Sequence, residues 1–326
     1  MDHALEYRKP GDAHLVPIAK PVITKPCEVF VRALWSGISR GTERLIFGGA
    51  VPESEYQRMR APFQRGDFPF PVVYGYSMVG IVEEGPQSLV GKTVFALYPH
   101  QSRFVLPADA VTVLPDDLPP RRATLAANME TALNAVWDGG VGPGDRVAIV
   151  GGGILGGLVA GLCASIPGVE ATLIDVEETR RSLVDDMNVI FRKPMNAPSG
   201  CDVVFHTSSS ANGLETAIRC AGFESTIVEM SWYGEGQTPV SLGGAFHSQR
   251  LRIVSSQVGH VSPMRRARWP YARRLAKALD LLCDDRFEAL LTSEVAFADL
   301  PRALPDILAP KAQGLATAVR YDGDGA

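Results

Sequence analysis

The sequence predicts an α/β protein in which a doubly wound parallel sheet is inserted into a mostly β domain. Three observations lead to this prediction. Short apolar runs alternate with helical patterns between residues 144 and 254, as in a parallel sheet covered by helices. The first of these runs ends in a G-x-G-x-x-G motif. The first 118 residues are instead rich in β-branched and aromatic residues and in proline, which is typical of strands joined by irregular loops.

Each element follows from its local pattern. In the first part of the chain we predict strands over 29–35, 72–82, 91–98, 103–106 and 111–114, with a long loop or short helix over 50–71. An alanine-rich helix over 121–137 precedes strands over 147–150, 171–174, 203–205, 226–230 and 251–254, with helices ending near 166 and over 178–187 and 213–220. The tail is predicted to form a helix over 275–282, a strand near 295, a helix over 304–308 and a strand over 317–320.

These elements divide the chain into three segments. Residues 1–118 are expected to form the first part of a β-rich domain, and residues 119–262 an α/β domain that contains the glycine motif. Residues 263–326 are expected to return to the first domain. A length of 326 residues agrees with two domains.

The glycine motif carries the clearest functional signal. Gly151 permits a tight turn, Gly153 lets backbone N–H groups approach a pyrophosphate, and Gly156 lets helix and strand pack closely. Ile154 and Leu155 begin the helix, whose N-terminus offers unpaired N–H donors and a partial positive charge. We therefore predict a Rossmann-type dinucleotide site here, with a purely structural glycine turn as the alternative.

The ends of the later strands add candidate cofactor ligands. Asp175 ends the second strand, 19 residues after Gly156. Its carboxylate would accept hydrogen bonds from the adenosine ribose and repel a 2′-phosphate, so NAD(H) is favoured and NADP(H) is the alternative. Arg180 is either a phosphate ligand or part of a solvated helix face. Thr207 and Met230 end two further strands at the same sheet edge, where they could contact the cofactor or simply pack.

Composition excludes several classes of function. A formal net charge of −4 gives no global reason to expect nucleic acid or an anionic membrane as a partner. We expect a cytoplasmic protein, since the sequence has neither a signal-peptide pattern nor a membrane-spanning apolar run. The five cysteines lack C-x-x-C spacing, which argues against a disulfide scaffold or a cysteine-built zinc site. The aromatic and arginine residues of the 56–68 loop suggest a small substrate of anionic or aromatic character.

Together these features resemble the medium-chain dehydrogenase/reductase superfamily. The resemblance covers nearly the whole chain, and its strongest local matches are 35–43, 71–76 and 142–157. It implies a Rossmann domain inserted into a GroES-like catalytic domain, and a homodimer formed through the sheet edge at residues 251–254. The wording Ser-Gly-Ile-Ser-x-Gly-Thr-Glu also resembles, distantly, the bacterial branch that includes bacteriochlorophyllide hydroxyethyl dehydrogenase.

The chain departs from zinc-dependent members of this superfamily at the metal ligands. The catalytic ligand positions hold Ser39, Tyr76 with Ser77, and Ala127, and hydroxyl or methyl groups are poor zinc ligands. The four-cysteine lobe for structural zinc should follow Tyr98 but is missing. We therefore predict that neither zinc site exists, which is typical of a zinc-free branch.

The resemblance also implies further cofactor contacts. It places Arg40 at the pyrophosphate and Thr131 against the nicotinamide. A surface arginine and ordinary helix packing are the respective alternatives.

Without zinc, side chains must carry the hydroxyl proton during hydride transfer. His100 has a suitable ordinary pKa, Glu130 could act as a carboxylate base, and Tyr76 and Tyr98 could face the reacting carbon. The alternatives are a loop histidine bonded to backbone and tyrosines that only pack in the core.

Three functions remain open at this stage. The first is a zinc-independent NAD(H) oxidoreductase that interconverts a secondary alcohol and a ketone or related carbonyl. The second is an NAD(P)H-dependent reductase of activated C=C bonds, of the quinone or enoyl type. The third is a dinucleotide-binding protein that has lost catalysis.

Overall fold

The computed structural model describes residues 1–322, which form two compact units. Unit 1 comprises Met1–Ala127, Leu275–Cys283 and the chain from Leu291, and unit 2 comprises Asn128–Arg274 and Asp284–Leu290. The expected α/β class with an inserted parallel sheet is confirmed.

The unit boundaries differ from the expected ends at residues 118 and 262. The short helix α2 (Pro120–Ala123) packs on strands of unit 1. Residues 263–274 instead belong to unit 2, because Trp269 packs on Trp137 and Arg274 pairs with Glu130. Packing partners beyond the reach of local composition therefore set both boundaries.

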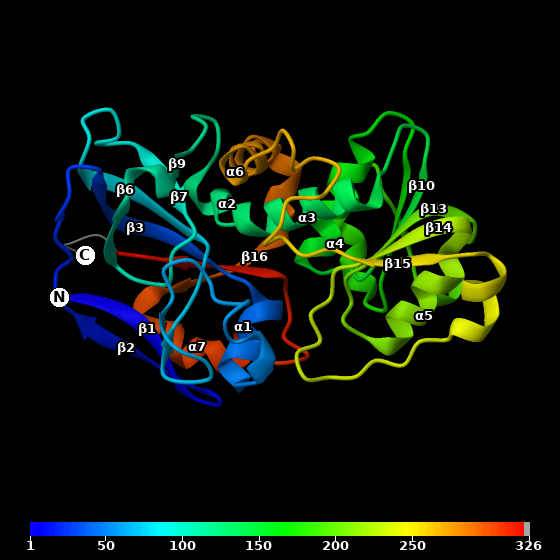
Figure 1. The fold of residues 1–326 in the computed structure, drawn as a ribbon, viewed down its shortest axis with the longest axis horizontal. Coiled ribbons are helices and arrows are strands. Elements are labelled where there is room, and N and C mark those ends of the chain that lie inside the picture. The colour runs from blue at the N-terminus through cyan, green and yellow to red at the C-terminus, as the bar shows by residue number, and fades with distance from the viewer. Residues whose placement is uncertain (323–326) are drawn as a thin grey trace. The chain divides into compact units, whose positions relative to one another are not determined.

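Unit 2 is built on a six-stranded sheet with the order β12-β11-β10-β13-β14-β15, and every neighbouring pair is parallel. Figure 1 shows β10, β13, β14 and β15 side by side. The strands are β10 (Arg146–Val150), β11 (Glu170–Ile174), β12 (Ile190–Arg192), β13 (Cys201–His206), β14 (Ala221–Glu229) and β15 (Arg252–Ser255). Their continuous apolar runs are typical of strands buried on both faces. β12 is an element that we did not predict, since only Phe191 of its three residues is buried.

The order of these strands reverses between β10 and β13. β10 leads to β11 on one side, and β13 leads to β14 on the other. Right-handed crossovers in opposite directions place their helices, α4 (Ile154–Ala164) and α5 (Ala211–Cys220), on opposite faces of the sheet. The carboxyl ends of β10 and β13 therefore flank the switch point, where open sheets of this type bind ligands.

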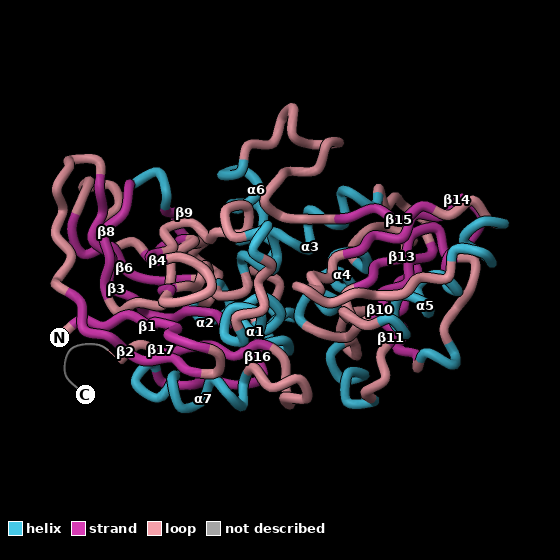
Figure 2. The backbone as a smooth tube through the Cα atoms, turned by 60° about the horizontal axis from the view of Figure 1, so that its bottom comes forward, coloured by secondary structure: helices cyan, strands magenta, loops and turns pink. Residues whose placement is uncertain are grey.

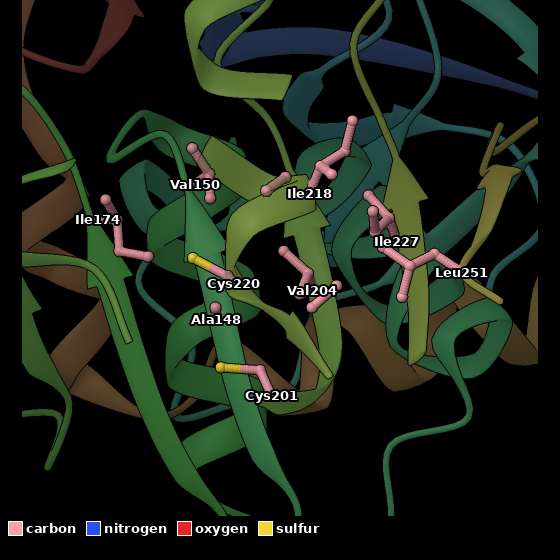
Figure 3. Packing of buried hydrophobic residues seen from close by; sticks show 11 residues of the cluster. Ala148, Val150, Ile174, Cys201, Val204, Ile218, Cys220, Ile227 and Leu251 are labelled. Atoms are coloured by element: carbon pink, nitrogen blue, oxygen red, sulfur yellow. The ribbon is translucent and has the colours of Figure 1, made fainter. Parts of the chain in front are cut away.

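One face of the sheet is sealed by an apolar cluster, shown in Figure 3. Val150, Val204 and Ile227 come from neighbouring strands, and Ile218 and Cys220 of α5 pack over them. Burial raises the pKa of the Cys220 thiol to about 12, so it stays protonated at neutral pH and behaves as a small apolar group.

The remaining helical segments of unit 2 complete its layers. α3 (Ala126–Gly139) precedes β10, and the 3-10 helix η3 (Glu178–Leu183) stands where a longer helix over 178–187 was predicted. A second 3-10 helix, η6 (Asp285–Leu290), packs on α4. A β-carbon on Gly157 would lie 2.5 Å from a methyl of Leu290, so glycine allows η6 this close. Figure 2 shows the irregular segment that joins β15 to the next helix.

Unit 1 contains two sheets. The larger has the order β16-β17-β3-β6-β7-β9, with β8 also paired to β3, and the smaller has the order β2-β1-β5-β4. The strands are β1 (Asp2–Lys9), β2 (Asp12–Ile18), β3 (Glu28–Ile38), β4 (Arg65–Gly66), β5 (Val72–Val73), β6 (Met78–Glu84), β7 (Thr93–Ala96), β8 (Arg103–Pro107), β9 (Val111–Val113), β16 (Leu291–Ala296) and β17 (Ala316–Arg320). The tail returns to this unit as expected, because β17 pairs with β3.

Besides α2, unit 1 contains α1 (Arg40–Gly48), α7 (Leu300–Ile307) and, from Leu275 on, most of α6 (Tyr271–Leu281). The predicted single strand over 72–82 is interrupted at residues 74–77, which separate β5 from β6. Gly75 has φ +129°, and a β-carbon there would lie 2.8 Å from the ring of His100. The interruption therefore passes directly beside this histidine. Within residues 1–322, every helix is too short or too polar to cross a lipid bilayer.

The sheet of unit 2 depends on apolar packing at its centre. Replacing Ile227, which is fully buried, with Ala should lower the free energy of unfolding by about 2–5 kcal/mol. Ile190→Ala on the outer strand is the matched control, because Ile190 is 46% exposed. Urea denaturation checks this expectation, and equal losses in the two variants would contradict the assignment of the core.

Candidate functional site

The turn from β10 to α4 brings two backbone segments into direct contact. Gly151 has φ +114°, a conformation that favours glycine. A β-carbon on Gly156 would lie 1.8 Å from the carbonyl oxygen of Gly151, which leaves no room for any other residue. Gly153 caps the helix, and a β-carbon on it would meet no atom within 4 Å. The tight turn predicted at Gly151 and the close packing predicted at Gly156 are thus present, whereas the approach of a pyrophosphate at Gly153 stays a prediction.

The carboxylate of Asp175 is held against this turn. Its Oδ2 accepts a hydrogen bond from the backbone N–H of Gly152 at 2.5 Å, and its Oδ1 accepts one from Glu177 at 2.8 Å. A β-carbon on Gly152 would lie 3.1 Å from the side chain of Arg180. The Asp175 carboxylate and the Arg180 side chain thus border the same turn. The carboxylate could bind an adenosine ribose, and the guanidinium could bind a 2′-phosphate on that ribose.

Other predicted cofactor residues lie at the same edge of unit 2. The Thr207 hydroxyl donates to the carbonyl of Gly151 at 2.8 Å, and the N–H of Met230 donates to the carbonyl of His206 at 3.0 Å. Ile154 and Leu155 form the first turn of α4. These residues fit a nicotinamide dinucleotide. The space beside Gly153 is open, and the N–H groups at the N-terminus of α4 could bind the diphosphate there.

In unit 1, hydroxyl groups stand at the positions that the superfamily resemblance assigns to zinc ligands. The Tyr76 phenol has the hydroxyls of Ser39 and Thr42 among its neighbours. Burial raises the pKa of Tyr76 to about 12, although these two hydroxyls oppose the rise. Ser77 donates its hydroxyl proton to the carbonyl of Thr124 at 2.5 Å. Tyr76 is therefore a protonated phenol at neutral pH.

Behind these hydroxyls lies a buried carboxylate. Glu43 is 1% exposed and accepts hydrogen bonds from the Tyr7 hydroxyl and the backbone N–H of Ser39, both at 2.8 Å. Its Oε2 also lies 3.2 Å from Nε2 of His100. Each contact offsets part of the cost of burying a charge. The carboxylate thereby fixes the backbone where β3 passes into α1.

His100 continues this network on its other side. Its Nδ1 lies 2.7 Å from the Ser36 hydroxyl, which is 3.1 Å from the Tyr321 hydroxyl. Every group is satisfied when Tyr321 donates to Ser36, Ser36 donates to Nδ1, and Nε2–H donates to Glu43. His100 is 1% exposed, so it supports the site from within and offers no face to a substrate.

This donor set does not fit zinc. Ser39 and Tyr76 supply hydroxyl groups, and the Ser77 hydroxyl is hydrogen-bonded to a backbone carbonyl. The side chain of Ala127 has no atom that could bind a metal ion. Zn²⁺ is held in proteins by thiolate, imidazole or carboxylate. Across residues 1–322, no cluster of three or more His, Cys, Asp and Glu side chains could hold a metal ion.

Comparisons with known proteins agree with this architecture. No protein-family model matches the chain. A 2-dehydro-3-deoxy-L-galactonate 5-dehydrogenase from Pseudoalteromonas atlantica is 26% identical over 169 residues, which are 48% of this chain and 49% of that relative. The chain therefore spans about half the length of this curated relative.

Solved structures match over nearly the full length. L-Idonate 5-dehydrogenase from Escherichia coli gives a TM-score of 0.80 at 14% identity, covering 98% of each chain. A dehydrogenase from Sinorhizobium meliloti, described as zinc-binding and solved with NADP, gives a TM-score of 0.76 at 19% identity, covering 98% of this chain and 99% of that one. The chain has the medium-chain dehydrogenase fold. The comparisons support the superfamily resemblance, but neither a zinc-free branch nor similarity to bacteriochlorophyllide hydroxyethyl dehydrogenase.

The structure also shows where the other predicted site residues lie. Tyr98 is stacked between Phe63, at 5.3 Å, and Phe104, at 4.2 Å, and burial raises the pKa of its phenol. Its ring therefore forms part of an aromatic stack.

Glu130 and Thr131 both lie on α3. The Oε1 of Glu130 accepts from the Arg274 guanidinium at 3.0 Å. Burial raises the pKa of Glu130, whereas the charge and hydrogen bond of Arg274 oppose this rise. A carboxylate engaged in a buried ion pair is poorly placed to act as a base. Thr131 is half-buried, and its contact with nicotinamide stays a prediction.

Arg40 is engaged within unit 1. Its guanidinium donates to the backbone carbonyls of Ala312 at 2.8 Å and Gly314 at 2.9 Å, among others in this segment. These bonds tie the start of α1 to the chain just before β17. Pyrophosphate binding by Arg40 stays a prediction, and it would have to compete with these carbonyls.

Sequence reasoning missed the members of the buried network that carry no motif of their own. Glu43 was part of the quoted Ser-Gly-Ile-Ser-x-Gly-Thr-Glu segment but was not assigned a role. Ser36 lies in the same segment, whereas Tyr7 and Tyr321 lie near opposite ends of the chain. Only the place of Glu43 within this segment could have drawn attention to it.

The glycine turn generates a matched pair of substitutions. Gly156→Ala should lower the free energy of unfolding by about 1–3 kcal/mol or more, because its methyl group collides with the Gly151 carbonyl. Gly153→Ala should change it by no more than about 0.5 kcal/mol. The Gly153→Ala methyl group would instead occupy the approach for a pyrophosphate and weaken NADH binding. Thermal denaturation and NADH fluorescence check both, and equal stability of the two variants would contradict the close contact.

Proposed function

We propose that the chain is a zinc-independent oxidoreductase that uses NAD(H) to interconvert a secondary alcohol and a ketone or related carbonyl. The observation that carries the proposal is the buried phenol of Tyr76, which stands with Ser39 at predicted metal-ligand positions and has the Thr42 hydroxyl as a further neighbour. Such a phenol can supply the proton and the hydrogen bond that a metal-free carbonyl reduction needs. The curated and structural relatives named above are dehydrogenases, which supports this class of reaction.

The cofactor site of unit 2 supports the nicotinamide part of the proposal. Gly151, Gly153 and Gly156 would hold the diphosphate, and Asp175 the adenosine ribose. When bound, the nicotinamide supplies or accepts the hydride. Asp175 favours NAD(H), whereas the neighbouring Arg180 keeps NADP(H) as the alternative. Because the similar Sinorhizobium meliloti dehydrogenase was solved with NADP, the test below includes both NADH and NADPH.

Tyr76 would act as the proton donor to the substrate oxygen. Because burial raises its pKa to about 12, the phenol keeps its proton at neutral pH. In the reduction, that proton passes to the oxygen of the former carbonyl as hydride reaches the carbon. Such a high pKa makes tyrosinate hard to form, so near pH 7 the phenol is in the protonated state that carbonyl reduction requires of its proton donor.

Glu43 and His100 would be positioning residues. The Glu43 carboxylate accepts a hydrogen bond from the N–H of Ser39, whose hydroxyl is a neighbour of the Tyr76 phenol. His100 compensates the carboxylate through Nε2. The role first predicted for His100, direct proton carriage, is thereby replaced by support of the residues around Tyr76.

A small anionic substrate agrees with the surroundings of Tyr98. Phe63 stacks on this ring, and the positive charge of Arg65 acts on the Tyr98 phenol. Arg58 and Arg60 contribute less, because each is paired with a carboxylate of the same loop. The match to a dehydrogenase of 2-dehydro-3-deoxy-L-galactonate, a carboxylate, supports the same class.

The central test is turnover by Tyr76→Phe. This variant should lower kcat for ketone reduction about 10²–10⁴-fold, the usual contribution of a positioned proton donor, and leave the Kd for NADH within about twofold. Tyr271→Phe is the control, since Tyr271 is 54% exposed and donates to the Gly259 carbonyl. Stopped-flow and steady-state assays with NADH and NADPH on ketone and enone panels provide the measurement.

Each competing function gives a distinct outcome in this assay. Turnover of enones without ketones would support the C=C reductase. NADH binding without any turnover would support the non-catalytic protein. Unchanged turnover of ketones by Tyr76→Phe would remove Tyr76 from the mechanism.

Zinc independence is tested separately. Dialysis against EDTA and 1,10-phenanthroline should leave kcat unchanged, because Ser39 and Tyr76 offer hydroxyls in place of metal ligands. Elemental analysis of the same samples gives the zinc content per chain. Loss of activity that zinc restores would overturn this part of the proposal and leave the nicotinamide part intact.

A further inference from the structure

The connection from β12 to β13 crosses one face of the unit 2 sheet as a short segment. It consists of residues 193–200 and passes β11 and β10, which lie between the two strands that it joins. A crossover that includes a helix takes about 10–12 residues or more, so the helical part of this one is the 3-10 turn η4 (Pro194–Asn196). Ala197 of the connection packs against the apolar cluster of Figure 3, beside α5. The connection therefore lies on the α5 face of the sheet.

A cavity of about 210 Å³ lies between this connection and the amino ends of the strands. Asn196 and Pro198 of the connection line one side of it. On the other side, Arg146 and Cys201 are the first residues of β10 and β13. The glycine turn and Asp175 follow the carboxyl ends of β10 and β11. The cavity is therefore at the opposite end of the sheet from the proposed cofactor site.

The strand register brings three polar side chains to the same face as the cavity. Ala148, a member of the apolar cluster, pairs with Thr172 of β11, and Thr172 pairs in turn with Ile190 of β12. Because side chains two residues apart on a strand share a face, Arg146 and Arg192 lie on the same face as Thr172. All three line the cavity.

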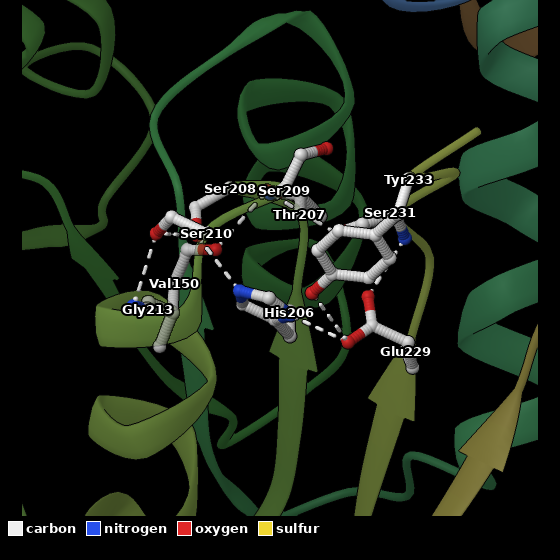
Figure 4. Close-up of polar contacts among 10 residues, drawn as sticks. All are labelled: Val150, His206, Thr207, Ser208, Ser209, Ser210, Gly213, Glu229, Ser231 and Tyr233. Carbon is white, nitrogen blue, oxygen red and sulfur yellow. Dashed lines mark hydrogen bonds and ion pairs between the residues drawn. The ribbon is translucent and has the colours of Figure 1, made fainter. Parts of the chain in front are cut away.

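Thr172 is a buried residue whose hydroxyl lacks a partner. It is 8% exposed, and among residues 1–322 no group forms a hydrogen bond with its Oγ1. Polar groups at the carboxyl ends of the same sheet are paired, as Figure 4 shows, with His206 2.7 Å from both Oε2 of Glu229 and Oγ of Ser208. Burying a hydroxyl without a hydrogen bond is costly. An unpaired hydroxyl that lines a cavity therefore points to a ligand that it can bind.

The charges around the cavity favour an anion. Arg192 donates to the Phe191 carbonyl, and within the described residues it pairs with no carboxylate. Nε of Arg146 lies 3.8 Å from a carboxylate oxygen of Glu170, in an exposed and therefore weak pair. Burial raises the pKa of the Cys201 thiol to about 11, so the thiol stays protonated at neutral pH and adds no negative charge. Two guanidinium groups thus face a single carboxylate.

We propose that this cavity binds a small oxyanion, the carboxylate or phosphate group of a small molecule, with the Arg192 guanidinium and the Thr172 hydroxyl as donors. An ionised oxyanion only accepts hydrogen bonds, and the planar guanidinium matches carboxylate and phosphate alike. The Asn196 amide supplies a further donor from the connection. A volume of about 210 Å³ lies below the range of about 300–1,000 Å³ that is typical of drug-sized ligands, so the ligand is small.

The test titrates the full chain with malonate and with inorganic phosphate by isothermal titration calorimetry at constant ionic strength. At least one anion should bind at millimolar concentration and raise the Tm, because it binds the folded state. Tighter binding of malonate assigns a carboxylate ligand, and tighter binding of phosphate assigns a phosphate ligand. Neither binding nor stabilisation by either anion would overturn the inference.

Substitutions at Thr172 locate the bound anion. Thr172→Val should weaken binding about tenfold, the effect of losing a hydrogen bond to a charged group. Thr172→Ser keeps the hydroxyl and should stay within about twofold of the unmodified chain. Thr226→Val is the control, since Thr226 is half-buried on β14, outside the cavity lining. Equal loss in Thr226→Val, or none in Thr172→Val, would overturn the inference.

Charge substitutions should act in opposite directions. Arg192→Gln should weaken binding about tenfold, whereas Arg250→Gln, which removes the same charge from an exposed arginine paired with Glu224, should leave it unchanged. Glu170→Gln should tighten binding about two- to fivefold, because it removes the carboxylate that competes for Arg146. Weaker binding in Glu170→Gln, or equal loss in the two arginine variants, would contradict the proposed site.

Saturating NADH separates this cavity from the glycine turn. Anion binding that NADH leaves unchanged supports a site at the amino ends of the strands, and displacement of the anion by NADH would assign it to the cofactor site and overturn the inference. The titration requires neither turnover nor NADH binding. Failure of the oxidoreductase proposal would therefore leave this inference standing, and its own failure would leave that proposal intact.

Discussion

The contact between α4 and the end of β10 is the constraint on which unit 2 depends. A β-carbon on Gly156 would lie 1.8 Å from the Gly151 carbonyl oxygen, so the helix N-terminus is pressed onto the strand end. In the same turn, the Gly151 carbonyl accepts a hydrogen bond from the Thr207 hydroxyl. The N–H of Gly152 donates a hydrogen bond to the Asp175 carboxylate. Displacing it would therefore move three neighbouring strand ends together.

Buried carboxylates organise polar groups in both units. Glu43 is compensated by Tyr7, Ser39 and His100, and Glu229 by His206 and its neighbours. A buried charge is costly unless hydrogen bonds replace its hydration, and each such bond fixes the group that donates it. The two carboxylates thus determine where the surrounding hydroxyls point.

The hydroxyls at the metal-ligand positions change the chemistry that the fold can support. Zinc acts as a Lewis acid and lowers the pKa of a bound alcohol. Burial raises the pKa of the Tyr76 phenol to about 12, so this group keeps its proton at neutral pH. In the reaction that we propose, this phenol would donate the proton to the substrate oxygen in place of the polarisation that a metal provides.

The sequence by itself determined the α/β class, five of the six parallel strands and the glycine turn followed by Asp175, because periodicity and local backbone requirements depend on adjacent residues. It did not determine the unit boundaries or the partners of buried polar groups. Ser36 and Tyr321 are 285 residues apart, and His206 was assigned no role before Glu229 was seen beside it. Only the tertiary structure decides such pairs, since the compensation of a buried charge depends on groups that folding brings together.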